Sequence, residues 1–361
     1  MRDVPLLIIG AGPAGLSAAY RAAEAGCDVL LLERAKKIGG QLVKQTHKFF
    51  GSEKQFASTR GIHIVDILAG RTKDLPGKVE ILTDATVLGI YEDGVVTADI
   101  AGTIEKIRPQ AVIVATGAYE RTLAFPGNDL PGVYGAGAVQ TLMNEYGIKP
   151  GDQVLMVGAG NIGLIVSYQL MQAGVKVKAV IDAADRIGGY LVHASKIRRA
   201  GVPILVRHTV EAALGDSEVE QAVIVEIDDE WQPIKETRQV LDVDVICVAV
   251  GLSPLADLLY QAGAKSFYIS PLGGHVPLRD QNMMTTLENI YIAGDVAGIE
   301  EASSAMVEGE LAGVAAAQKL GYETPDTDQL KESCLAELRQ LRAGPTGGKI
   351  RTGLALAGVY S

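Results

Sequence analysis

Short apolar runs that end in glycine-rich turns recur along the chain. The run VPLLIIG before the first turn and the run DQVLMVG before a later one each read as a buried strand. Each is followed by a helical pattern, which ends at Gly26 in the first case and at Gly174 in the second. A β-rich run comes next both times. The segment from Gly10 thus aligns with the segment from Gly158, and the order strand, turn, helix, strand occurs twice.

The segments between and after these units predict further strands and helices. Residues 78–108 alternate apolar and polar positions, which indicates a small antiparallel meander ending in the strand AVIVATG. Residues 220–251 repeat that arrangement in the second unit. The run MTTLENIYIAGDV then predicts a strand, followed by a small-residue helix over 302–320. From residue 326 the pattern predicts one amphipathic helix and a glycine-rich end.

This order of elements predicts an α/β fold with two Rossmann-like, three-layer (ββα) dinucleotide-binding domains. If the strand YIAGD returns to the first sheet, the first domain is discontinuous and the second is inserted in it. We expect one domain over 1–120 and 251–325, the inserted domain over 121–250, and a C-terminal helix and tail over 326–361. That tail is a candidate contact with another subunit.

Composition and charge narrow the classes of function. The 361 residues carry a net charge of -10, and no cluster of Lys and Arg could follow a phosphate backbone, so we expect no nucleic-acid partner. No run of 18 apolar residues occurs, which predicts no membrane span. The N-terminus shows no cleavable signal peptide, and the three cysteines lie far apart, so we expect a cytoplasmic protein.

The first glycine turn has the spacing of a dinucleotide site. Gly10 permits the tight turn, Gly12 lets the backbone approach a pyrophosphate, and Gly15 lets the helix pack close to the strand. Glu33 ends the next strand 23 residues after Gly10, where an acid can accept hydrogen bonds from ribose hydroxyls. The alternative is a purely structural turn with a solvated Glu33.

The motifs GAGPAG, IGGQ, ATG and TTLENIYIAGD together resemble the two-dinucleotide-fold flavoprotein family that includes thioredoxin reductase. The resemblance covers residues 1 to about 320 and implies FAD in the first domain. It also implies that Asp295 binds the ribityl chain and that the helix after Asp295 points its positive end towards the flavin; a plain helix N-cap is the alternative for Asp295. The residues expected at FAD are Gly10, Gly12, Pro13, Ala14, Gly15, Glu33, Gly40, Gln41, Ala115, Thr116, Gly117, Gly294 and Asp295.

The second turn keeps its glycines but its acid is displaced. Ile181 aligns with Glu33, and the nearest acid, Asp182, comes one place later. Either a one-residue extension before Ile187 brings Asp182 to the ribose, or the site has lost its ribose acid. No Arg pair directly follows this strand to hold a 2′-phosphate, which favours NAD(H) over NADP(H); Arg186, Arg198 and Arg199 lie further on. A fold that binds no nicotinamide, or only an adenine nucleotide, stays open. The residues expected at NAD are Gly158, Gly160, Asn161, Ile162, Gly163, Asp182 and Gly251.

The segment from Gly39 to Ser52 should run along the flavin, as its counterpart does in the family. Lys44 and His47 are weak candidates for a catalytic contact with the ring, and a structural role for His47 is the commoner outcome. Phe49 and Phe50 read as core residues. No metal site is expected.

The cysteines argue against disulfide reduction. That activity needs a vicinal thiol pair beside the flavin, and the chain has no CxxC. Cys27, Cys247 and Cys334 all read as packing residues. Electrons must then leave the flavin directly, to nicotinamide or to another redox centre.

A second resemblance narrows the family. The segment ATGAYERTLAFPGNDLPGVYGAGAVQTLM is similar to the α-type subunits of sarcosine oxidase, dye-linked proline dehydrogenase, opine oxidase and hydrogen cyanide synthase. This chain lacks the Cys-rich extension of several members. The resemblance implies that the partner is a separate flavoprotein or dehydrogenase subunit. The residues that match are Glu120, Arg121, Phe125, Pro126, Gly127, Leu130, Pro131, Gly132, Ala136, Gly137, Ala138 and Gln140.

These observations lead to an FAD-dependent pyridine-nucleotide oxidoreductase. We expect a subunit that passes electrons between FAD and NAD(H) in a hetero-oligomeric dehydrogenase, whose partner acts on a small-molecule substrate: an amine, amino acid or small polyol. One alternative is a stand-alone NAD(P)H-dependent flavin or ferredoxin reductase. The other is a nucleotide-binding scaffold subunit without nicotinamide chemistry.

Overall fold

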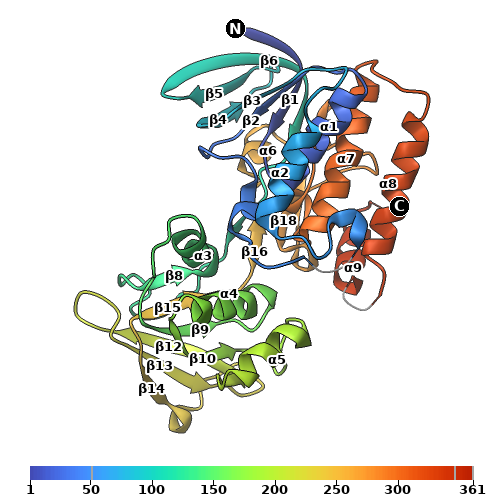
Figure 1. Ribbon diagram of the computed structural model, residues 1–361. Helices are drawn as coiled ribbons and strands as arrows, with labels where there is room; N and C mark the ends of the chain where they lie inside the picture. The colour runs from blue at the N-terminus through green and yellow to red at the C-terminus, as the bar shows by residue number, and fades with distance from the viewer. Residues whose placement is uncertain (50–51, 345–346, 360–361) are drawn as a thin grey trace. The chain divides into compact units, whose positions relative to one another are not determined.

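The chain forms two compact units in a computed structural model that describes residues 1–49, 52–344 and 347–359. The first unit comprises Met1–Tyr119 and Leu252–Ser361, and the second comprises Glu120–Gly251 (Figure 1). The chain passes between the units at two short strands that pair with each other, β7 (Ala118–Glu120) and β16 (Leu252–Pro254). None of the helices in the described ranges is long and apolar enough to cross a membrane.

A sheet with a parallel centre forms the core of the first unit. Its strand order is β3-β2-β1-β6-β5-β4, and β19 pairs with the second half of β6. The pairs β2–β3, β1–β2, β1–β6 and β6–β19 are parallel, because their connections cross over the sheet. The strands are β1 (Arg2–Ile9), β2 (Val29–Leu32), β3 (Val79–Leu82), β4 (Ala85–Ile90), β5 (Val96–Ile100), β6 (Thr103–Val114) and β19 (Ile290–Ile292).

The meander predicted over 78–108 forms only in part. Strands β4, β5 and the first half of β6 are antiparallel, as the alternation predicts. The first predicted strand, β3, instead pairs with β2 in parallel and extends the central sheet. The strand AVIVATG is not separate either, because β6 runs without a break through twelve residues. Alternation does not identify the neighbour of a strand, so this difference could not be seen in the sequence.

Small residues let the helices of the first unit approach closely. Helix α7 (Ala302–Lys319) packs against both α1 (Pro13–Glu24) and α8 (Thr327–Leu341) (Figure 1). A Cβ added at Gly309 would overlap the carbonyl oxygen of Ala14, so α1 and α7 are in backbone contact there. Because α7 covers the turn after β1, residues distant in sequence meet at that turn.

The C-terminal segment differs from its prediction. Within the described part of this segment, two helices follow Asp326 instead of one: α8 and a second helix, α9 (Gly348–Leu356), formed by the glycine-rich end. Leu354 of α9 is buried with Leu272, Ile269 and Val276, which lie in and beside a short 3₁₀ turn of the first unit. This tertiary contact stabilises α9, and the glycine-rich composition of the segment gave no indication of a helix.

The second unit repeats the central arrangement. Its parallel strand order is β11-β10-β9-β15-β8, and the antiparallel strands β12, β13 and β14 form a separate sheet. The strands are β8 (Val133–Gly135), β9 (Gln153–Val157), β10 (Lys176–Asp182), β11 (Ile204–Val206), β12 (His208–Leu214), β13 (Gln221–Glu226), β14 (Gln239–Asp242) and β15 (Val245–Val248). The helices of this unit are α3 (Ala136–Asn144), α4 (Asn161–Gln172) and α5 (Leu191–Arg199). The remaining elements belong to the first unit: α2 (Gly61–Arg71), α6 (Asp257–Gln261), β17 (Ser266–Ile269) and β18 (Gly274–Pro277).

Candidate functional site

The turn between β1 and α1 has no room for side chains. Gly10 has φ +102°, and a Cβ there would overlap the carbonyl oxygen of Ala115; a Cβ on Gly15 would overlap that of Gly10. Gly12 is the N-cap of α1, and no side chain of the described residues caps this helix, which begins at Pro13 and Ala14. Backbone N–H groups at an uncapped helix start suit a phosphate. The turn therefore fits a dinucleotide pyrophosphate.

The carboxylate of Glu33 lies directly beside this turn. Its Oε2 accepts a hydrogen bond from the backbone N–H of Ala11 at 2.8 Å, and its Oε1 accepts one from Ala35 at 2.9 Å. Each oxygen keeps a second lone pair, so the carboxylate can also accept from ribose hydroxyls. Glu33 is buried, which contradicts the alternative of a solvated side chain.

Two further segments close around the same turn. Gly39 donates its N–H to the carbonyl of Ala11 at 2.8 Å, and a Cβ on Gly40 would lie 2.9 Å from the Cα of Gly12. Gln41 follows on the exposed side of a short 3₁₀ helix (Gly40–Lys44). The IGGQ segment thus packs on the glycine turn, as a pyrophosphate cradle requires.

The ATG segment lies at the end of β6. Ala115 donates its N–H to the carbonyl of Ile9 at 2.8 Å, which places it beside the turn. Thr116 and Gly117 contact Leu255, which follows β16. The Oγ1 of Thr116 donates to the carbonyl of Leu255 at 2.6 Å, and the carbonyl of Gly117 accepts the N–H of Leu255 at 2.9 Å. These contacts hold the ATG segment against the segment that contains Leu255 in the first unit.

Lys44 and His47 are half-buried after the IGGQ segment. The His47 ring stacks on Phe49, with 6.0 Å between ring centroids, and Phe49 packs against the main core, as predicted. Phe50 lies outside the described residues. A catalytic contact from Lys44 or His47 stays a prediction.

Gly294 and Asp295 reach the turn from the C-terminal half of the chain. A Cβ on Gly294 would lie 3.0 Å from the Cβ of Ala14, at the start of α1. Asp295 begins a separate short turn, and its Oδ1 accepts the N–H of Glu300 at 3.2 Å. The small-residue helix predicted over 302–320 is confirmed as α7, which begins at Ala302 with Glu301 as its N-cap, so the alternative in which Asp295 is a plain N-cap of this helix is wrong.

The environment of Asp295 raises its pKa. Burial is the main cause, and the negative charges of Glu308 and Glu300 add to it, while the N–H of Glu300 acts in the opposite direction. The resulting pKa is about 7. The carboxyl group therefore titrates near neutral pH, where a hydrogen-bonding ligand can select either form.

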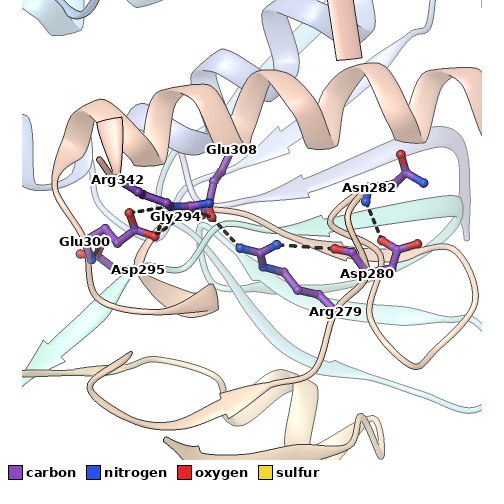
Figure 2. Close-up of polar contacts among 8 residues, drawn as sticks. All are labelled: Arg279, Asp280, Asn282, Gly294, Asp295, Glu300, Glu308 and Arg342. Carbon is purple, nitrogen blue, oxygen red and sulfur yellow. Dashed lines mark hydrogen bonds and ion pairs between the residues drawn. The ribbon is translucent and has the colours of Figure 1, made fainter. Parts of the chain in front are cut away.

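Four charged residues near Asp295 were not predicted from the sequence. Glu308 of α7 accepts the N–H of Gly294 on Oε2 at 3.0 Å, and its Oε1 accepts from Arg279 at 2.8 Å and from Arg342 at 2.6 Å (Figure 2). Arg342 also forms an ion pair with Glu300 at 2.7 Å. No spacing rule joins residues from four separate segments, so only the fold reveals this cluster.

The turn of the second unit is built in the same way. A Cβ on Gly158 would overlap the carbonyl oxygen of Ala249, and one on Gly163 would overlap that of Gly158. Gly160 is the N-cap of α4, which has no side-chain cap from the described residues. A phosphate therefore fits here by the same criteria.

Asp182, not Ile181, is the structural equivalent of Glu33. Strand β10 contains a bulge between Val177 and Ala179, which inserts Lys178 as one extra residue. Asp182 Oδ2 then accepts the N–H of Ala159 at 2.6 Å, and Oδ1 accepts that of Ala184 at 2.9 Å. The one-residue extension considered from the sequence is therefore present, but it lies inside the strand at Lys178 and not between Asp182 and Ile187.

The other expected nicotinamide-site residues lie around this turn or at the crossing. Asn161 accepts the N–H of Tyr190 on its side-chain oxygen at 2.8 Å, and the side chain of Ile162 is exposed. Gly251 accepts the N–H of Arg121 at 3.0 Å and stands at the end of the second unit. Arg186, Arg198 and Arg199 are all exposed. Whether these residues contact a nicotinamide cofactor stays a prediction.

Glu120, which the sequence marked only by resemblance, lies at a helix start in the second unit. Its Oε1 accepts the N–H of Gly137 at 2.6 Å, in the first turn of α3. A Cβ on Gly135 would overlap this carboxylate. The motif that contains these three residues therefore forms one local hydrogen-bonded structure, which explains its small residues.

All three cysteines are buried and free, as predicted for packing residues. Burial raises the pKa of the Cys27 and Cys334 thiols to about 12, and raises that of Cys247 as well. Such thiols are not nucleophilic at neutral pH. Among the described residues, no group of three His, Cys, Asp or Glu side chains is placed to hold a metal ion.

The paired turn-and-acid sites agree with the match to a known family, described as pyridine nucleotide-disulphide oxidoreductase, over residues 4–309. The chain belongs to this family. Its members are oxidoreductases that bind FAD and a pyridine nucleotide. The match confirms the predicted oxidoreductase class and the α/β fold with two dinucleotide-binding domains.

Individual relatives in this family are named as parts of larger enzymes. The chain is 26% identical to one of the subunits of opine oxidase from Agrobacterium tumefaciens, over 89% of this chain and 67% of that protein. It is 29% identical to the alpha subunit of sarcosine oxidase from a Corynebacterium species, over 88% of this chain but only 33% of that protein. The structure of L-proline dehydrogenase from P. horikoshii shares the fold, with a TM-score of 0.72 at 24% identity over 94% of this chain and 59% of that one. The chain thus spans one to two thirds of these proteins.

Proposed function

We propose that this chain is an FAD-dependent oxidoreductase subunit that passes electrons between FAD, held in the first unit, and NAD(H), held in the second. We further propose that it works within a hetero-oligomeric dehydrogenase whose partner subunit oxidises an amine, an amino acid or a small polyol. When bound, FAD would supply the ring that exchanges a hydride with nicotinamide. The chain's own residues would bind and orient the two cofactors.

One observation carries the proposal: both units place a carboxylate beside an uncapped glycine turn. Glu33 accepts from Ala11 in the first unit, and Asp182 accepts from Ala159 in the second. Each pair positions a ribose acceptor next to a pyrophosphate cradle. Two such sites in one chain support a dinucleotide in each unit.

The acid in the second unit also supports NAD(H) over NADP(H). A 2′-phosphate would meet the carboxylate of Asp182, whose two oxygens already hold Ala159 and Ala184 in place. Like charges at such a short distance repel. The exposed Arg186 follows this acid, but no ion pair between the two is present among the described residues.

The buried cysteines support an enzyme other than a disulfide reductase. Disulfide exchange needs an accessible thiolate, and burial favours the protonated thiol of Cys27, Cys247 and Cys334. The family description names disulphide oxidoreductases, so the family does not decide against disulfide reduction. The argument against that activity in this chain comes only from its own buried thiols. The names of the relatives, which are subunits of oxidases, support the presence of a partner in a larger complex.

An anaerobic absorbance titration of the purified chain tests the proposal. We expect bound flavin that bleaches on addition of NADH and much less with NADPH. Flavin that stays oxidised with both nucleotides would contradict the electron-transfer role and favour a scaffold subunit. Copurification with a second flavoprotein subunit supports the complex, whereas a homodimer that reduces ferredoxin at full rate would favour a stand-alone reductase.

A further inference from the structure

A buried ion cluster links the C-terminal helices to the candidate flavin site. The cluster consists of Arg279, Glu300, Glu308 and Arg342, and it surrounds the Gly294–Asp295 turn (Figure 2). The side chains of Arg279, Glu308 and Arg342 are each 4% exposed. Charges held this far from water interact strongly with one another and with any ligand beside them.

Glu308 connects the flavin-site backbone to the cluster. Its Oε2 accepts the N–H of Gly294, while its Oε1 accepts from both Arg279 and Arg342. Without its two cations, this carboxylate would be a buried group with no ion-pair partner, and the contact that holds Gly294 would lose its support. The position of the turn therefore depends on the two arginines.

Arg342 also fixes the segment that follows Asp295. Its Nε donates to Glu300 at 3.0 and 3.1 Å and its Nη2 at 2.7 Å, so the guanidinium holds the carboxylate with two nitrogens. The backbone N–H of the same Glu300 donates to the side chain of Asp295. Arg342 thus acts on Asp295 through a single intervening residue.

The C-terminal helices bring Arg342 to this place. Arg342 is the C-cap of α8, and its carbonyl oxygen accepts a hydrogen bond from Arg351 of α9. Both helices lie beyond residue 309, where the family match ends. The residues that the family match covers therefore do not include this cation.

We infer that Arg342 is a positioning residue of the flavin site, so that α8 and α9 are part of the cofactor-binding apparatus. This inference rests on the proposed function. Arg342 holds the Asp295–Glu300 segment in place and offsets the charge of Glu300 and Glu308. The cluster holds the carboxyls of Glu300 and Glu308 and the guanidinium groups of Arg279 and Arg342, and the carboxyl of Asp295 lies beside it. Loss of one cation would leave an excess of negative charge beside the proposed flavin site.

The test compares the Arg342→Gln and Arg339→Gln variants of the full chain. Arg339 lies on the same helix end and carries the same charge, but it is exposed. We expect Arg342→Gln to weaken FAD binding about tenfold or more, since it breaks a buried ion pair. We also expect a more negative flavin reduction potential, by about 30 mV if the two-electron equilibrium shifts tenfold. Arg339→Gln should change neither quantity, and Arg342→Lys should restore most of the potential.

A Glu300→Gln variant should shift the flavin reduction potential in the opposite direction. It removes one negative charge from the same cluster, so the potential should become more positive. It also serves as the test if Arg342→Gln does not fold. An unchanged potential in Glu300→Gln, or an equal shift in Arg339→Gln, would overturn the inference. A lower melting temperature of Arg342→Gln with unchanged FAD affinity and potential would also overturn it.

These measurements need no nicotinamide. If the wild-type chain binds no FAD, the proposed function fails as a whole. If the wild-type chain binds FAD and the variants match it in affinity and potential, only the role of Arg342 fails.

Discussion

The carboxylate of Asp182 accepts a hydrogen bond from the backbone N–H of Ala159, with 2.6 Å between nitrogen and oxygen. Glu33 and Ala11 form the same contact in the first unit at 2.8 Å. An aspartate is one methylene shorter than a glutamate, yet both carboxylates lie beside their turns. The two units therefore hold the same kind of acceptor where we propose that a ribose binds, and each proposed site can be tested separately.

Asp182→Ala should impair nicotinamide binding without loss of FAD. Each hydrogen bond from a hydroxyl to the carboxylate contributes about 1.5–3 kcal/mol, so we expect the NADH concentration for half-reduction to rise about tenfold to a hundredfold. An anaerobic titration measures this concentration. Asp185→Ala is the matched control, because Asp185 is exposed and lies three residues later, just after the end of β10. Equal effects of both variants would contradict the role of Asp182.

Glu33→Gln should weaken FAD binding and leave the second site intact. The amide keeps the shape of the side chain but loses the charge that strengthens its bonds to Ala11 and to ribose. We expect FAD to dissociate about tenfold more readily, as measured by fluorescence of the released flavin. Glu92→Gln on an exposed turn should retain FAD. A Glu33→Gln protein that keeps its flavin as tightly as wild type would contradict the prediction.

Gly309→Ala should destabilise the first unit, because the new Cβ would overlap the carbonyl oxygen of Ala14. Overpacking of this kind costs about 1–3 kcal/mol. Gly70→Ala is the matched control on α2, where nothing lies within 4 Å of the new Cβ. There the substitution should stabilise by about 0.5–1 kcal/mol through helix propensity. Urea unfolding measures both changes, and a stabilised Gly309→Ala variant would show that α1 and α7 are not in backbone contact.

The raised pKa of Asp295 predicts a pH dependence of stability. A carboxyl that binds its proton more tightly in the folded state makes the free energy of unfolding fall as the pH rises from its unfolded pKa, about 4, to its folded pKa. The folded pKa is about 7. Asp295→Asn cannot lose a proton, so its free energy of unfolding should fall less between pH 5 and 7.5. Glu300, whose pKa is also raised, retains part of the slope in the variant. Identical slopes in urea titrations of the two proteins would contradict the assignment.

The thiols should take no part in electron transfer. We expect the wild-type chain to accept two electrons per FAD in an anaerobic dithionite titration, because all three thiols are buried and free. A redox-active dithiol would raise this number to four. Replacing Cys27 and Cys334 together by Ala should leave the rate of flavin reduction by NADH unchanged. A requirement for four electrons, or a lost rate in this variant, would contradict the prediction.

Local sequence patterns were sufficient to predict the two repeated units and the carboxylate of Glu33 beside the first glycine turn. The glycine spacing follows from steric limits within a few residues of Gly10 and Gly158, and apolar runs identify buried strands. The position of Glu33 could be predicted from spacing because its strand, β2, pairs with β1 without an extra residue. The resemblance of whole motifs then indicated the family, which the comparison confirms.

Other features depend on contacts between distant segments, and only the tertiary structure decided them. The bulge at Lys178 sets the register of Asp182, because pairing with β9 determines which residue is extra. The parallel pairing of β3 with β2 depends on which edge of the central sheet is free to accept another strand. The cluster of Arg279, Glu300, Glu308 and Arg342 spans 64 positions of the chain from 279 to 342. Buried charges are stabilised by partners that the fold brings together, and no local rule in a sequence states which partners those are.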